Sequence, residues 1–153
     1  MVRHNEDMHN SAYIKTWVGN LVPQTSYESD NQAQGAGWGS VRNIRFSNFV
    51  VEGADSGPAI TEDSGDSGSY AGTSLMEISN VAFVNFTGYL SGKEKSKRTA
   101  SVSCSKVHPC FNVAFENVTL TTTRNSTSTG SSSCSYISPG GVHGLSGKGC
   151  SGV

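Results

Sequence analysis

The residues near the start of the chain that could do chemistry are two aromatics and a lysine in the string Tyr13-Ile14-Lys15-Thr16-Trp17. Side chains of a β-strand alternate between its two faces, so a strand here would put Tyr13, Lys15 and Trp17 on one face. A lysine in such a position is most simply a solvent-facing residue. A binding role for Lys15 therefore needs support from the rest of the chain.

An acidic, glycine-rich string, TEDSGDSG, contains Glu62, Asp63 and Asp66. Carboxylate oxygens are suitable calcium ligands, but the string lacks the ligand series and the bidentate glutamate of an EF-hand loop. A solvated loop is the simpler interpretation. The sequence predicts no metal site here and no cofactor anywhere in the chain.

The four cysteines, Cys104, Cys110, Cys134 and Cys150, all lie in the last third of the chain. Their close pairs suggest the disulfides Cys104–Cys110 and Cys134–Cys150, although four cysteines allow three connectivities. Zinc binding is the competing interpretation, but the chain has no C-x-x-C spacing.

Three N-x-[ST] sequons mark Asn85, Asn117 and Asn125 as candidate glycosylation sites. Beside paired cysteines, they indicate an oxidising, secretory environment. The first twenty residues lack the apolar segment of a signal peptide, and no stretch is long and apolar enough to span a membrane. We therefore expect a secreted, extracellular protein whose signal peptide was lost with an N-terminal part of the chain.

Overall charge gives no indication of a nucleic acid or of an anionic membrane surface as partner. The 153 residues carry 11 Lys and Arg against 12 Asp and Glu, a formal net charge of −1. A protein that binds either surface through charge normally has a basic excess.

The elements that would position these residues are short strands in a repeat. Segments 43–49, 80–86 and 112–118 all match N-[IV]-x-F-x-N-[FV], and they begin 37 and then 32 residues apart. Asn tolerates left-handed backbone, and stacked Asn side chains can form amide ladders. Several short strands in each repeat are typical of a β-solenoid, with an antiparallel sandwich as the alternative. We expect solenoid coils over residues 1–121 and an irregular, disulfide-tied Ser/Thr/Gly-rich tail over 122–153.

Three motifs in order carry a family resemblance: the Tyr13–Trp17 string, the string from Gly37 to Val41, and the string from Cys104 to Cys110. Together with the repeat, they resemble the C-terminal region of fungal family 28 glycoside hydrolases, in particular the exo-acting polygalacturonases. The resemblance implies a right-handed parallel β-helix, secretion, and hydrolysis of α-1,4-galacturonosyl linkages in pectin. The implied mechanism is inverting, with a carboxylic acid and a carboxylate base on opposite sides of the scissile bond.

The motifs that hold the family's catalytic acids are missing. The sequence contains no Asp-Asp pair and no Gly-His-Gly, and Asn5-Glu6-Asp7 fits N-x-D only by chance, too close to Lys15. The family's R-I-K motif corresponds to Tyr13-Ile14-Lys15. The resemblance therefore implies that Lys15 holds a galacturonate carboxylate, that Tyr13 replaces the usual arginine and could hydrogen-bond or stack on a sugar, and that no catalytic residue is present.

We thus expect the C-terminal part of a pectin hydrolase that is inactive alone, acts on pectic polysaccharide when intact, and is monomeric at full length. Uncapped solenoid coils expose strand edges, which predicts poor solubility for this chain alone. The alternative hypothesis is a non-catalytic cell-wall or carbohydrate-binding β-helix protein.

Overall fold

The computed structural model describes residues 2–4, 8–20, 22–23, 33–34, 37–64, 70–91, 93 and 98–150, and the regular elements in these ranges are strands. Within the described residues, no helix is long and apolar enough to cross a membrane. The strands are β1 (Val2–His4), β2 (Tyr13–Trp17), β3 (Val22–Pro23), β4 (Ala33–Gln34), β5 (Trp38–Ala54), β6 (Ala59–Ser64), β7 (Leu75–Leu90), β8 (Arg98–Ser103), β9 (Phe111–Thr121), β10 (Ser131–Ser135) and β11 (Val142–His143).

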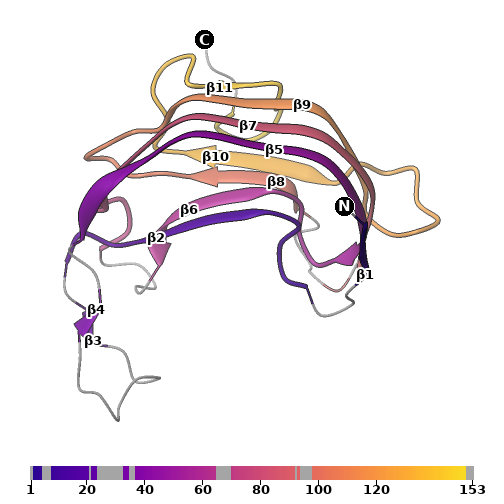
Figure 1. Cartoon of the computed structure of the whole chain (residues 1–153), viewed down its shortest axis with the longest axis horizontal. Coiled ribbons are helices and arrows are strands. Elements are labelled where there is room, and N and C mark those ends of the chain that lie inside the picture. Colours follow the sequence, from indigo (N-terminus) through magenta and orange to yellow (C-terminus); the bar gives the residue numbers. More distant parts are fainter. Residues whose placement is uncertain are drawn as a thin grey trace.

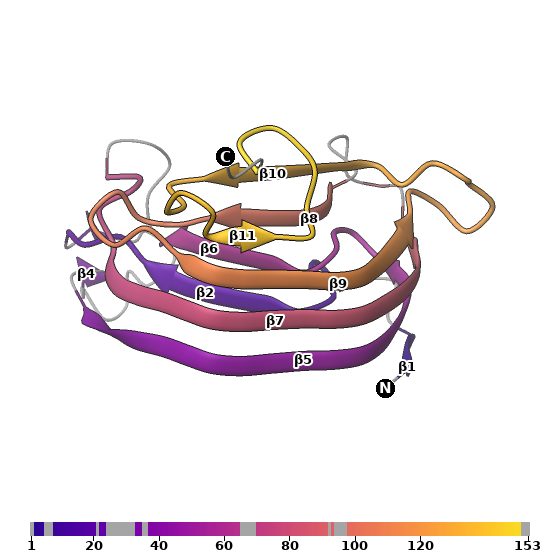
Figure 2. The same cartoon turned by 90° about the horizontal axis from the view of Figure 1, so that it is seen from above.

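The strands stack into two parallel sheets that face each other, as Figures 1 and 2 show. The four-stranded sheet has the order β10-β8-β6-β2, and the five-stranded sheet has the order β1-β5-β7-β9-β11. Along the chain, strands of the two sheets alternate from β5 onward, so each coil adds one strand to each sheet. The short pair β3 and β4 is antiparallel and separate. The predicted right-handed parallel β-helix is confirmed.

The long strands of the five-stranded sheet arch over the molecule because two asparagines in each repeat adopt left-handed backbone (Figure 1). In β7, the φ angles of Asn80 and Asn85 are 52° and 57°. Each such residue interrupts the two-residue alternation, so that Val81, Phe83 and Phe86 all face inward and are at most 1% exposed. The N-[IV]-x-F-x-N-[FV] motif therefore encodes a strand with a bend at each Asn.

The asparagines of successive coils form two amide ladders on the outer surface. In one ladder, Asn80 Nδ2 donates to Asn43 Oδ1 at 3.3 Å, and Asn112 Nδ2 donates to Asn80 Oδ1 at 2.6 Å. In the other, Asn85 donates to Asn48 and accepts from Asn117. The ladders predicted from the repeat are confirmed, and they fix the coil register.

The core between the sheets contains stacks of phenylalanine rings. Phe83 lies between Phe46 and Phe115, with ring centroids 5.2 Å and 4.9 Å away. Phe49 and Phe86 form a second stack with centroids 4.6 Å apart. Phe46 and Phe49 on β5 remain half-buried, because among the described residues only the three-residue β1 pairs with the outer edge of β5. Among the described residues, the ring stacks are thus least covered at the β5 end.

The Ser/Thr/Gly-rich tail is more regular than its composition suggests. It is irregular over residues 122–130, but β10 then extends the four-stranded sheet and β11 extends the five-stranded sheet. A Cβ atom added to Gly147 would lie 2.1 Å from the carbonyl oxygen of Ser132, and one added to Gly149 would lie 2.1 Å from that of Cys134. The glycines therefore allow the tail to pack directly against β10, a packing role that composition alone did not reveal.

Candidate functional site

The outer face of the four-stranded sheet begins with the side chains predicted from the sequence. Along β2, Ile14 and Thr16 are buried at 8% and 7% exposure, whereas Tyr13 is 40% exposed and Lys15 is exposed. Trp17 is half-buried on the same side as these two residues. The predicted alternation is therefore confirmed, and two aromatic rings flank one cation on this face.

Lys15 is held beside the indole ring of Trp17. Its Nζ atom lies 5.5 Å from the ring centroid, within the range of a cation–π contact. Parallel pairing puts Thr61 of β6 in register with Lys15, and Ala59 in register with Tyr13. The neighbouring strand thus offers a hydroxyl and a methyl group, both small, beside the two exposed side chains of β2.

The described outward-facing side chains of this sheet carry positive charge at Lys15 and Arg98. None of the outward-facing side chains that the structure describes on β2, β6, β8 and β10 is a carboxylic acid. Glu62 on β6 is fully buried and faces the core. A lysine ammonium group such as that of Lys15 can donate charge-assisted hydrogen bonds to a carboxylate ligand.

The described outer face of the four-stranded sheet does not carry the two carboxyl groups of a glycosidase catalytic pair. Inverting hydrolysis needs two carboxyl groups on opposite sides of the scissile bond, about 6.5–9.5 Å apart. The described outer face supplies neither carboxyl group. Asn5-Glu6-Asp7 lies outside the described residues, as do Asp66 and the side chain of Asp63 in the acidic string.

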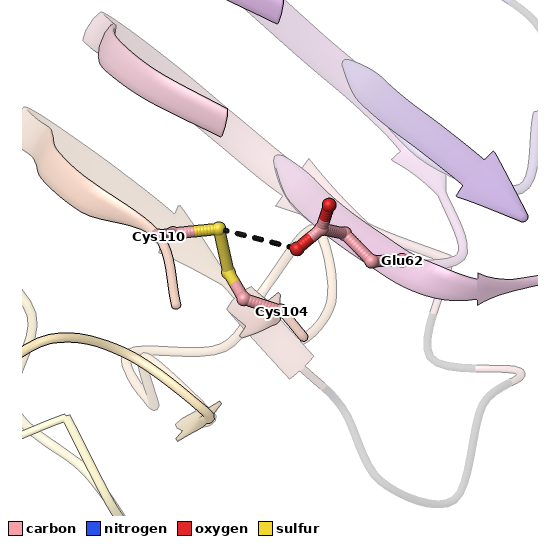
Figure 3. Close-up of side chains that lie close together, drawn as sticks. All are labelled: Glu62, Cys104 and Cys110. Atoms are coloured by element: carbon pink, nitrogen blue, oxygen red, sulfur yellow. Dashed lines mark hydrogen bonds between the residues drawn. A yellow bond between two sulfur atoms is a disulfide. The ribbon is translucent and has the colours of Figure 1, made fainter. Parts of the chain in front are cut away.

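Three residues of types that can bind a metal ion lie together in the core. The side-chain oxygen or sulfur atoms of Glu62, Cys104 and Cys110 are within 4.8 Å of one another. Figure 3 shows why it is not a zinc site: the two sulfur atoms are bonded to each other. Zinc binds thiolates, which a disulfide does not provide. Glu62 Oε2 is 3.7 Å from Cys110 Sγ. Because a disulfide sulfur carries no hydrogen, a hydrogen bond here must be donated by a protonated carboxyl group.

Both disulfides predicted from the spacing are present, Cys104–Cys110 and Cys134–Cys150. The first closes the turn between β8 and β9. The second joins β10 to the end of the tail, with Cys134 packed against the core and in register with the buried Val102 of β8. Zinc coordination by these cysteines is therefore excluded while the bonds are intact.

The three sequons differ in their surroundings. Asn85 and Asn117 belong to one amide ladder, with Asn117 Nδ2 donating to Asn85 Oδ1 at 3.1 Å. Asn125 is exposed in the turn that follows β9. Glycosylation at these three residues stays a prediction, and Asn125 is the one whose side-chain amide is not part of a ladder.

Comparison with known proteins assigns the chain to a family. Residues 30–147 match the sequence model of glycosyl hydrolases family 28. A relative from Aspergillus niger that bears the name galacturan 1,4-alpha-galacturonidase C is 63% identical over 147 residues, 96% of this chain and 34% of the relative. A relative of the same name from Neosartorya fischeri is 58% identical over the same shares of the two chains.

A more distant relative, an alpha-L-rhamnosidase of Aspergillus niger, is 30% identical over 155 residues, 96% of this chain and 32% of the relative. No solved structure matches the chain. The chain spans about a third of the length of the curated relatives it matches. The match to the family model and the high identity to the first two relatives show that the chain belongs to family 28 of the glycosyl hydrolases.

Proposed function

We propose that this chain provides galacturonate binding in the hydrolysis of α-1,4-galacturonosyl linkages of pectin. The observation that carries the proposal is Lys15, exposed on the outer face of β2 between two aromatic side chains. Galacturonan has one carboxylate on each sugar, and a charge-assisted hydrogen bond from an ammonium group suits that carboxylate. The names of the two most similar relatives reported above support the same substrate.

In this proposal, the three outward residues of β2 have separate roles. Lys15 binds the carboxylate of one galacturonate. Tyr13 donates a hydrogen bond from its phenol or packs its ring on a sugar face. Trp17 holds the Lys15 ammonium group in position by the cation–π contact.

The described residues of this chain bind the substrate but do not transfer the protons. Hydrolysis by an inverting mechanism requires an acid to protonate the leaving oxygen and a base to activate water. The outward-facing side chains described on the four-stranded sheet include neither. We therefore expect no release of reducing ends from polygalacturonate by this chain alone, and sustained turnover would refute that assignment.

The choice of galacturonate over a neutral sugar can be tested by calorimetric titration at low salt. The ligands are trigalacturonate and a neutral oligosaccharide of rhamnose, the sugar in the name of the more distant relative. A charge-assisted hydrogen bond contributes about 1.5–3 kcal/mol, so Lys15→Met should weaken trigalacturonate binding by about tenfold or more. Lys15→Arg should retain most of the affinity, because it keeps the charge.

The matched control is Lys106→Met, at an exposed lysine in the turn between β8 and β9, where Nζ lies 5.1 Å from the Tyr136 ring. It should bind trigalacturonate as the unchanged chain does. Equal affinity of the Lys15→Met variant and the unchanged chain would contradict the proposed role. So would a preference for the neutral oligosaccharide.

The alternative is a non-catalytic β-helix that binds cell-wall carbohydrate, which the lack of carboxyl groups on the described outer face would also fit. Family membership favours the enzyme, and sugar binding without any catalytic counterpart would favour the alternative.

We also propose that the protein is secreted and extracellular, which the two disulfides and the sequons support. A monomeric state at full length stays a prediction.

A further inference from the structure

A pocket of about 420 Å³ lies over β6, β8, β10 and the tail. Hydroxyl side chains dominate its lining, which suits the hydroxyl groups of a sugar, because each can donate one hydrogen bond and accept others. The hydroxyl residues of the lining are Thr61, Ser101, Ser103, Ser133 and Ser135.

The pocket is continuous with the Lys15 face. Thr61 lines the pocket and is also the register partner of Lys15. Ser103 is in register with Thr61, and Ser135 is in register with Ser103. Neighbouring strands are about 4.8 Å apart, so this row extends about 15 Å from Lys15 across the sheet. A linear polysaccharide held at Lys15 can therefore reach the pocket by following the same face.

The charged residues of the pocket are both cations. Arg98 and Lys148 line it, and no acidic side chain appears among its described lining residues. The Lys148 backbone is fixed on β10, because its carbonyl oxygen accepts a 2.8 Å hydrogen bond from Cys134 N. The Cys134–Cys150 disulfide closes the same segment. The tail thereby brings an exposed cation to a surface of hydroxyl groups.

We propose that this pocket is a second uronate-binding subsite, in which Arg98 and Lys148 bind the carboxylate of a sugar further along the polysaccharide held at Lys15. The inference rests on the proposed function and adds to it the direction in which the substrate runs, from β2 across β6 and β8 towards β10. It also gives the disulfide-tied tail a role, since the tail supplies one of the two cations.

The test compares digalacturonate with hexagalacturonate in calorimetric titrations of the 153-residue chain. In the unchanged chain, the hexamer should bind at least about tenfold more tightly than the dimer, because two linked contacts reinforce each other. Lys148→Gln, alone and combined with Arg98→Gln, should remove most of this gain and leave dimer binding within about twofold. Lys148→Gln tests the idea with little risk to folding, because the tail contacts use the Lys148 backbone.

The outcomes separate this inference from the proposed function. If the Lys15→Met change weakens binding but both pocket variants bind the hexamer as the unchanged chain does, the second subsite is wrong and the proposed function stands. If the unchanged chain binds neither oligomer, both are wrong. Displacement of the hexamer by millimolar inorganic phosphate as effectively as by digalacturonate would also overturn the inference, because the pocket would then be a general anion site.

Discussion

The amide ladder offers a sharp test of the fold, and Asn80 is its best position because it bonds to both neighbouring coils. Its side chain donates to Asn43 and accepts from Asn112. Its backbone is left-handed, with φ of 52°. Asn80 is not in a sequon, so glycosylation does not complicate the comparison.

Two substitutions separate the side-chain bonds from the backbone requirement. Asn80→Gly removes two exposed hydrogen bonds, and the loss of each should lower the stability by about 0.5–1 kcal/mol. Glycine also makes the unfolded chain more flexible, which lowers the stability by about 0.5–1 kcal/mol more. Asn80→Ala removes the same bonds but forces an L-residue with a Cβ into left-handed backbone, at about 1–2 kcal/mol. We expect Ala to be less stable than Gly by about 1 kcal/mol.

The assay is urea-induced unfolding followed by circular dichroism, with Thr87 on the same strand as control. Both Thr87 variants remove the sequon of Asn85, so they are compared with each other and not with the unchanged chain. Thr87 has ordinary strand backbone, so Thr87→Gly should be less stable than Thr87→Ala, the reverse of the order at Asn80. Equal stability of Asn80→Ala and Asn80→Gly would refute the backbone argument. An Asn80→Gly variant as stable as the unchanged chain would show that the ladder contributes nothing.

Three further outcomes follow from the core, the Cys134–Cys150 disulfide and the β5 end. Phe83→Ala should destabilise the chain by about 3–5 kcal/mol in the same assay, because it empties the middle of a buried ring stack. Replacing both Cys134 and Cys150 by Ser should lower the stability by about 3 kcal/mol, because the disulfide restricts a 16-residue loop in the unfolded chain. The measurement is thermal unfolding, with the reduced form of the unchanged chain as control. The half-buried β5 end should cause association that grows with concentration in sedimentation velocity, and a monomer at high concentration would contradict this expectation.

Much of the fold was predictable because the repeated motif determines how the strands of successive coils align. The two asparagines of each repeat mark the bends, and the Phe between them marks the core, so aligning the copies also aligns Phe46, Phe83 and Phe115 in space. The disulfides followed from spacing in the same way. Alternation along β2 was enough to put Tyr13 and Lys15 on one face.

Other features could not be predicted from composition. The tail strand β10 consists of serines and one cysteine, which have no apolar alternation, and it is a strand because β8 offers a parallel edge. Glu62 lies in a polar string that looks solvated, yet its position on β6 turns it into the core. The pocket over β6, β8 and β10 depends on the packing of the tail, which brings Lys148 beside residues of β8 such as Ser101 and Ser103.

The central claim is that the outer face of the four-stranded sheet binds galacturonate through Lys15. Its most direct test is a titration of isotope-labelled chain with trigalacturonate, followed by amide chemical-shift changes. We expect the changes to be concentrated on β2 and β6, to extend towards β8 and β10, and to be lost from β2 in the Lys15→Met variant. Changes centred on β5, β7 and β9, or a β2 response that survives the loss of Lys15, would contradict the account.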